Sequence, residues 1–242
     1  MEARPWWASA SSVSEQLNAL VKDLVTNLSA LQLEGEALLT SRGCGTETLG
    51  ASEEGCFKHN QEGVHEGGEW IEANLVPLGG GDLDPLLCGN DAGGGSTTLL
   101  PKLCEVLRRH HSLTPAESGA KRMTGVDIQL ARLSALRGST HIWPHCGPTN
   151  ARLRLHFPLL VPSGRYELTV ADKTRRWETG VPLIFDDSYR HEVVATPAAG
   201  NAKAVRLILI LDVWHPAVPL SERRRLGEQL VEWSERRSSY QL

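Results

Sequence analysis

The second half of the chain consists of short apolar segments separated by turn residues, and this pattern restricts the fold more than any other feature. Six segments have the composition of strands: residues 126–136, 152–161, 166–171, 181–185, 191–195 and 204–213. Turn sequences such as Pro162-Ser163-Gly164 stand between them. Many short strands at this spacing are typical of a β-sandwich or jelly roll. The pattern therefore predicts a mainly β fold with flanking helices.

The strand predicted over residues 152–161 carries cationic and apolar side chains on opposite faces. Because its residues alternate, Arg152, Arg154 and His156 point to one face, and the leucines and phenylalanine between them point to the other. Two arginines and a histidine on one side are costly to bury unless an anion lies against them. A solvated surface strand explains the same alternation. The strand alone leaves both a ligand pocket and a surface face open.

Length, composition and charge fit one domain without a nucleic-acid partner. The chain has 242 residues, 40% of them hydrophobic, and β-sandwiches and barrels often reach this length undivided. We expect one domain over residues 1–242, with a helical and loop-rich part at 1–125, a jelly-roll core at 126–216 and a C-terminal helix at 217–242. A net charge of -4 and a pI near 6.1 give no basic footprint for nucleic acid. The local arginines are therefore expected to serve a small anion or acidic side chains.

The sequence has no segment typical of export or membrane insertion. The N-terminal residues lack the basic and the apolar regions of a signal peptide. The longest apolar run, residues 207–211, is far too short to span a bilayer. We therefore expect a cytoplasmic protein without a membrane segment, or one of the endoplasmic reticulum lumen if the chain is a fragment. The five cysteines show no paired spacing, and their odd number leaves at least one thiol free.

The first part of the chain predicts a helix, an insertion and a short strand. Ser12 and Glu15 form the pattern of a capping box, and leucines and valines at helical spacing follow to about Leu39. This predicts one long amphipathic helix. Residues 43–68 are rich in Gly, Glu and Ser and have no period, which predicts a mobile insertion. Residues 69–75 are expected to form a short strand.

Two further helices are expected. Residues 79–95 form a glycine-rich connection without the Gly-Lys-Ser/Thr ending of a phosphate-binding loop. A helix with one apolar stripe is predicted over 97–110. Ser221 is expected to cap the C-terminal helix, in which Glu232 is placed to pair with Arg236.

Polar residues interrupt the predicted strands at six positions: Ser134, His145, Arg154, His156, His191 and Arg206. Two histidines on different strands of a jelly roll, with an arginine beyond the second, form the arrangement of a non-haem iron oxygenase that binds 2-oxoglutarate. Neutral imidazoles hold Fe(II) and leave positions open for the co-substrate and O2. The arginine forks onto the far carboxylate of the co-substrate.

One position departs from that arrangement. The third ligand is usually Asp or Glu two residues after the first histidine, where this chain has Gly147. Either water fills the third protein position or the metal is absent. Asp186 and Asp187 could substitute, but they lie in an expected tight turn, which favours a supporting or structural role. Cys146 is a weaker candidate because its side chain should point away from that of His145.

Three long segments closely resemble the catalytic domain of the aspartyl/asparaginyl β-hydroxylases: SALRGSTHIWPHCGPTNARLRLHFPLLVP, WETGVPLIFDDSYRHEV and VRLILILDVWHP. The N-terminal ARPWW is similar to the start of that domain, so the resemblance spans most of the chain. Members of this family hold iron with two histidines and no carboxylate, which agrees with Gly147. The resemblance implies a double-stranded β-helix, the cupin-like form of the jelly roll. It also implies Fe(II) as the metal and 2-oxoglutarate and O2 as co-substrates.

The resemblance assigns roles to individual residues. It implies His145 and His191 as the catalytic iron ligands. Four positions match residues that hold 2-oxoglutarate, with Ser134 and Arg206 at its distal carboxylate and Arg154 and His156 near its metal-chelating end. For the substrate, Arg152 is expected to meet an acidic side chain, and Trp70 matches a pocket tryptophan in a loosely aligned region.

The sequence thus leads to one hypothesis and two alternatives. The hypothesis is hydroxylation at the β-carbon of an Asp or Asn residue in a protein substrate, with EGF-like domains as candidates because the family's animal enzymes act on them. The alternatives are the same oxygenase chemistry on a small molecule or a lipid acyl chain, and a non-catalytic binding domain. The animal enzymes also have a cysteine pair in the region of residues 88–98. Only Cys88 has an evident counterpart here, so a disulfide between Cys88 and Cys104 is not expected.

Overall fold

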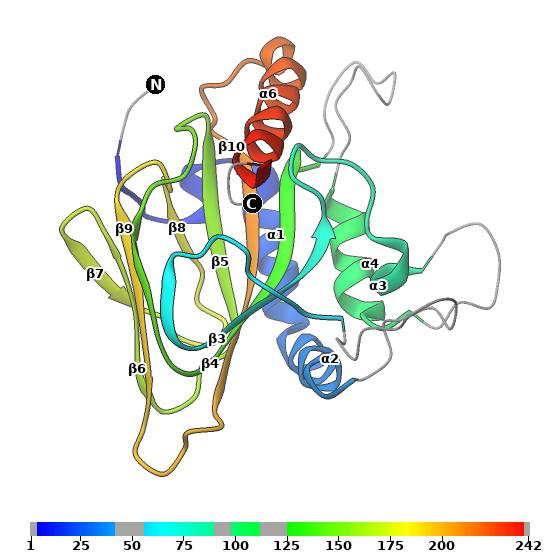
Figure 1. Ribbon diagram of the computed structural model, residues 1–242. Helices are drawn as coiled ribbons and strands as arrows, with labels where there is room; N and C mark the ends of the chain where they lie inside the picture. Colours follow the sequence, from blue (N-terminus) through cyan, green and yellow to red (C-terminus); the bar gives the residue numbers. More distant parts are fainter. Residues whose placement is uncertain (1–3, 42–55, 90–97, 112–124, 240–242) are drawn as a thin grey trace.

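One ten-stranded antiparallel sheet that curls on itself forms the frame of the protein (Figure 1). The computed structural model describes residues 4–41, 56–89, 98–111 and 125–239. The main path of the sheet has the order β1-β8-β5-β10-β4-β9-β6-β7, and β3 pairs with β4 and β2 with β3. The strands are β1 (Trp6–Trp7), β2 (Lys58–His59), β3 (His65–Val76), β4 (Ile128–His145), β5 (Arg152–Leu160), β6 (Gly164–Val170), β7 (Lys173–Arg176), β8 (Leu183–Phe185), β9 (His191–Pro197) and β10 (Val205–Trp214).

The long strand β4 connects the two layers of this sheet. Before Gly138 it pairs with β10, where Arg137 lies opposite Val205. After Gly138 it pairs with β9, where Thr140 lies opposite Ala195. Gly138 has a φ of 71°, a conformation that glycine adopts without the penalty of a side chain. This bend lets one strand belong to both layers, as a double-stranded β-helix requires, and the expected fold class is confirmed.

Alternation along the strands separates an apolar core from an inner cavity. On β5, Leu153, Leu155 and Phe157 are fully buried in the cluster that the helices cover. On β10, Leu207, Leu209 and Leu211 belong to the same cluster, whereas Ile208 and Ile210 line the cavity between the two layers. The continuous apolar run of β10 is therefore explained by burial on both faces.

The N-terminal helix is interrupted, contrary to the single helix predicted. It consists of a 3-10 turn (Ala10–Ser12), α1 (Glu15–Thr26) and α2 (Leu28–Thr40), which meet at Asn27. The amide of Asn27 donates to the Asp23 carbonyl and carboxylate, which stabilises the end of α1. The N-cap of α1 is Ser14, whose Oγ accepts from the Leu17 N–H at 3.0 Å, so the predicted capping box at Ser12 is wrong.

The N-terminal part of the chain differs from the sequence-based expectation in two further ways: it contributes strands to the sheet, and it contains a disulfide. The sheet is not confined to residues 126–216, because β1, β2 and β3 come from the N-terminal part. A disulfide joins Cys88, at the end of α3 (Pro85–Cys88), to Cys104 on α4 (Pro101–His110), with a Cα–Cα distance of 5.4 Å. The sequence did not predict this bond, because the two short helices bring the cysteines together without any recognisable sequence spacing. Cys146 is a free, exposed cysteine.

The remaining elements follow the prediction in outline. All six strands expected from residue 126 onward are present, while β7 adds a strand that was not expected. Of the predicted insertion, residues 42–55 lie outside the described residues, and the rest contains β2 and the start of β3. The helix α6 (Leu220–Ser239) ends the described chain and carries the expected ion pair of Glu232 with Arg236. Within the described ranges, no helix is long and apolar enough to cross a membrane.

Candidate active site

Two histidine rings lie next to each other, tilted by 53°, where β4 ends and β9 begins. His145 and His191 are direct partners in the pairing of these strands, and their ring centroids are 4.2 Å apart. Both line the inner cavity. The two imidazoles that the sequence singled out thus come together from separate strands.

Hydrogen bonds to the backbone fix the same tautomer in both rings. Nδ1 of His145 lies 2.7 Å from the Trp143 carbonyl oxygen, and Nδ1 of His191 lies 2.9 Å from that of Tyr189. Because a carbonyl oxygen can only accept, Nδ1 carries the proton in each ring and Nε2 keeps its lone pair. Burial and the neighbouring His145 lower the pKa of His191 to about 4, so this imidazole is neutral at neutral pH. An imidazole whose Nδ1 is hydrogen-bonded to the backbone can offer the lone pair of Nε2 to a transition metal.

A carboxylate fills the space beside Gly147. A Cβ at this position would lie 2.4 Å from Oδ2 of Asp187, so no larger residue fits without displacing it. The Gly147 N–H also donates to the Asp187 carbonyl oxygen at 2.6 Å. The absence of a side chain at position 147 is therefore built into the packing. Among the described residues, no group of three or more His, Cys, Asp or Glu is arranged to hold a metal, which leaves the two histidines as the protein's donor set.

Arg206 is a buried cation without an ion pair in the described part of the chain. It is 2% exposed, comes from β10 and lines the cavity, with its guanidinium carbon 4.9 Å from the centroid of the Trp177 ring. Its Nε has no hydrogen-bond partner. Burial lowers the pKa of Arg206 to about 9, which still leaves it charged at neutral pH. A buried charge in this state is costly unless a ligand compensates it.

Polar groups close to Arg206 complete this end of the cavity. Ser134 lies opposite Ile208 in the pairing of β4 with β10, and its Oγ accepts a hydrogen bond from Nε1 of Trp70 at 3.1 Å. Both Ser134 and Trp70 line the cavity, so the structure brings the loosely aligned Trp70 to the predicted site. The hydroxyl of Tyr166 and the indole N–H of Trp177 are buried without hydrogen-bond partners. Of these residues, Arg206, Ser134 and Trp70 line the cavity, whereas Tyr166 and Trp177 do not.

His156 forms part of the cavity wall. It is 6% exposed and lies edge-on to Phe185, with ring centroids 4.9 Å apart. Burial and then the charges of Arg154 and Arg206 hold the pKa of His156 well below its usual value. This ring is therefore neutral, and its Nδ1 has no hydrogen-bond partner.

The two arginines of β5 are tied into a buried network of ion pairs. Arg154 binds Asp212 with two parallel contacts, from Nε at 2.7 Å and from Nη2 at 2.8 Å. Arg152 contacts Asp212 and Asp187, each at 2.9 Å. Arg154 still lines the cavity, but Arg152 does not. This argues against the substrate contact predicted for Arg152, since both ends of its guanidinium already face carboxylates.

Sequence reasoning missed four charged residues at this site: Glu62, Glu72, Arg132 and Asp212. The first three line the cavity, and Arg132 donates to Glu72 at 2.6 Å. Alternation could have found Asp212 and Arg132. Asp212 lies an even number of residues after Arg206 on β10, and Arg132 lies two residues before Ser134 on β4, so each pair shares a strand face. Glu62 lies in the connection between β2 and β3, where the sequence has no periodic signal.

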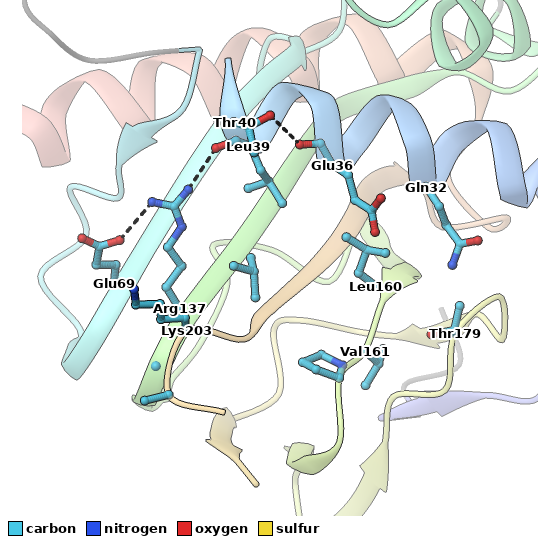
Figure 2. Close-up of a pocket in the computed structure, with 14 residues that line it drawn as sticks. Gln32, Glu36, Leu39, Thr40, Glu69, Arg137, Leu160, Val161, Thr179 and Lys203 are labelled. Atoms are coloured by element: carbon cyan, nitrogen blue, oxygen red, sulfur yellow. Dashed lines mark hydrogen bonds and ion pairs between the residues drawn. The ribbon is translucent and has the colours of Figure 1, made fainter. Parts of the chain in front are cut away.

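A larger hollow than the histidine cavity lies elsewhere in the described part of the molecule. It has a volume of about 1030 Å³ and is lined by residues of α2, the bend of β4 and the connection before β10. Figure 2 shows Arg137 bridging Glu69 and the Leu39 carbonyl oxygen at its edge. None of its lining residues is His or Cys. Size alone is therefore a poor guide here, and the smaller cavity at the histidines carries the candidate chemistry.

The fold and this cavity define a double-stranded β-helix with a two-histidine centre and a buried arginine beyond it. The chain belongs to the aspartyl/asparaginyl β-hydroxylase family, whose model matches residues 47–216. This is a family of Fe(II)- and 2-oxoglutarate-dependent hydroxylases. The family resemblance found in the sequence is thereby confirmed.

Known relatives support this membership over most of the chain. It is 32% identical to human aspartyl/asparaginyl beta-hydroxylase and 31% identical to the mouse protein of that name, in each case over 93% of this chain. The chain spans only about a quarter of the length of these relatives, 24% and 25%. It is also 40% identical to aspartate beta-hydroxylase domain-containing protein 2 of Xenopus tropicalis, over 40% of this chain and 25% of that protein. A solved 2OG-Fe(II) oxygenase family oxidoreductase from Burkholderia pseudomallei is similar with a TM-score of 0.37 and 13% identity, over 60% of this chain and 66% of that one.

Proposed function

We propose that this chain is an Fe(II)- and 2-oxoglutarate-dependent dioxygenase that hydroxylates the β-carbon of an Asp or Asn residue in a protein substrate. One observation carries the proposal: His145 and His191 present free Nε2 atoms to the same cavity that holds the unpaired Arg206. Membership of the family supports the reaction class. The substrate and the catalytic activity of this chain are the parts that experiment must supply.

The residues fit both groups that the family requires. Two imidazoles whose Nδ1 atoms are hydrogen-bonded to the backbone suit Fe(II), and the carboxylate beside Gly147 stands close to the place where other oxygenases have their third ligand. For 2-oxoglutarate, Arg206 and Ser134 would hold the distal carboxylate, because a buried guanidinium without an ion pair needs an anion. Arg154 and His156 line the same cavity and would lie near the other end.

The chain's part in the reaction is to hold and orient. When bound, Fe(II) with 2-oxoglutarate and O2 supplies the oxidation of an unactivated C–H bond, with succinate and CO2 as the other products. The Nδ1 hydrogen bonds of His145 and His191 fix the ring planes, so the metal donors do not need to reorganise. Asp212 fixes the guanidinium of Arg154 by its two contacts. The buried wall of His156, Phe185 and Trp70 keeps water away from the reacting carbon.

His191→Ala tests the proposal. The variant loses one of two protein donors, and we expect its iron content and its succinate formation to fall at least a hundredfold, since even supporting residues at metal sites cost ten- to a hundredfold. The matched control is His141→Ala on β4, a partly exposed histidine paired with Glu192 outside the cavity. Iron analysis of anaerobically purified protein and a 2-oxoglutarate turnover assay with Asp- and Asn-containing peptides give the two readouts. Full iron binding and turnover in His191→Ala would refute the proposed centre.

A further inference from the structure

The cavity wall and the ion-paired residues directly behind it together contain four guanidinium groups and four carboxylates. The cations are Arg132, Arg154 and Arg206 in its wall, with Arg152 directly behind it. The anions are Glu62 and Glu72 in the wall, with Asp187 and Asp212 behind it. The ionised groups of the described site therefore cancel, although the sequence alone shows mainly its arginines.

These eight groups act on one another as one set. Arg132 pairs with Glu72 at 2.6 Å, and Glu72 in turn favours the charged form of Arg206. Glu62 favours the charged form of Arg154, which pairs with Asp212. Asp212 also experiences the charges of Arg152 and Arg132. Arg132, Arg152 and Arg154 each form an ion pair with a carboxylate of the set, so among these four arginines Arg206 alone is left for a further anion.

The expected co-factors leave this balance unchanged. Fe(II) brings two positive charges, and 2-oxoglutarate with both carboxylates ionised brings two negative charges. An aspartate side chain entering the loaded site would add one uncompensated negative charge in a buried place, which is unfavourable. An asparagine side chain adds none.

We infer that this site prefers an asparagine side chain over an aspartate as the group to be hydroxylated. The inference rests on the proposed function and narrows its substrate class. Side by side in the wall, Arg132 and Glu72 offer a donor and an acceptor, which is the complement of a carboxamide. A carboxylate can use only the donor and is repelled by Glu72. Glu72 is thereby a specificity-determining residue.

The test compares matched peptides. Short acetylated and amidated peptides with randomised flanks carry either Asn or Asp at the central position, each Asn peptide having an Asp twin. We expect kcat/KM, followed as addition of one oxygen atom by mass spectrometry, to favour the Asn pool about tenfold, the effect of roughly one pKa unit of differential interaction. The dissociation constants of both pools, measured without O2 on protein loaded with Fe(II) and 2-oxoglutarate, should differ in the same direction.

Charge-neutral variants locate the cause. Glu72→Gln removes one negative charge and replaces one of the two acceptor oxygens by an N–H donor, so we expect the preference to shift towards Asp by about tenfold. Glu62→Gln removes a negative charge without breaking the Arg132 pair, so it should shift the preference in the same direction even if Glu72→Gln folds poorly. The matched control is Glu69→Gln, on the same strand as Glu72 but paired with Arg137 outside the cavity. It should leave the ratio unchanged.

The outcomes are separable. Equal or better binding and turnover of the Asp pool, unaltered by Glu72→Gln and Glu62→Gln, would overturn the inference and leave the proposed function standing. Binding of neither pool by protein that holds iron and 2-oxoglutarate would overturn the inference and the peptide substrate together. Loss of iron and 2-oxoglutarate binding in the unmodified protein would instead count against the proposed function itself.

Discussion

Arg154 and Arg206 lie on neighbouring strands and line one cavity, but their surroundings differ. Arg154 is held by Asp212 through two contacts and lies 3.3 Å from Asp187. Arg206 is more deeply buried, yet it makes no hydrogen bond or ion pair with the described residues. The face of Trp177 and the electrostatic influence of Glu72 and Tyr166 favour its charged form. The charge of Arg154 is compensated by carboxylates of the protein itself. The charge of Arg206 is compensated only when an anion binds.

One cavity thus contains both an arginine that stabilises the fold and an arginine that is free to bind a ligand. Breaking a buried ion pair leaves an uncompensated charge and costs much stability, whereas replacing a buried charge that has no partner by an apolar residue costs little or is stabilising. The two arginines should therefore respond in opposite ways to mutation. Stability measures the first, and 2-oxoglutarate affinity measures the second.

The largest effect is expected from Asp212→Asn. This change removes the carboxylate that faces both Arg152 and Arg154, and we expect the free energy of unfolding to fall by about 3–5 kcal/mol. Chemical denaturation followed by tryptophan fluorescence measures it. The control is Glu105→Gln, which removes an exposed ion-pair partner on α4 and should leave the free energy of unfolding nearly unchanged. Equal effects of the two variants would show that the buried network does not stabilise the fold.

Arg206→Met is expected to have the opposite profile. Two charge-assisted hydrogen bonds to a carboxylate would be lost, so the affinity for 2-oxoglutarate should fall about a hundredfold, which is roughly 3 kcal/mol. Without 2-oxoglutarate, the free energy of unfolding should stay the same or rise, because a buried unpaired charge has been removed. Calorimetric titration and denaturation measure the two quantities, with the exposed Arg165→Met as control. The contrast between the arginines fails if Arg206→Met unfolds as readily as Asp212→Asn and binds 2-oxoglutarate normally.

Much of this site could be read from the sequence, because strand alternation and two-histidine spacing are local patterns. The alternation of β5 placed Arg154 and His156 on the inner face and Leu155 in the core, as the structure has them. The family resemblance implied that His145 and His191 act together as metal ligands. Their direct pairing depends on the register of β4 and β9.

The rest depends on contacts between distant segments, which no local pattern contains. Arg152 looked like a substrate contact because its partners, Asp187 and Asp212, come from other strands and connections. The same holds for Cys88 and Cys104, which two short helices bring together. The break at Asn27 escaped prediction because apolar spacing continues across it, while a side-chain hydrogen bond to Asp23 ends α1 there.

Acid titration gives a smaller but sharper measure of the same contrast. Burial raises the pKa of the Asp212 carboxyl, but Arg152 and Arg154 together lower it by more than burial raises it. The pKa therefore lies below its usual value. The folded state therefore holds the ionised form, so this stabilisation is complete above the unfolded pKa of about 3.9 and is lost as the pH falls below it. One such group accounts for a slope of at most roughly 1.4 kcal/mol per pH unit.

The gap in unfolding free energy between the unmodified protein and Asp212→Asn should thus narrow between about pH 5 and pH 3. Arg206→Met should run parallel to the unmodified protein over the same range, because Arg206 does not titrate there. Denaturation curves at a series of pH values distinguish these courses, and a constant gap for Asp212→Asn would show that its carboxylate is not held in the ionised form by the two arginines.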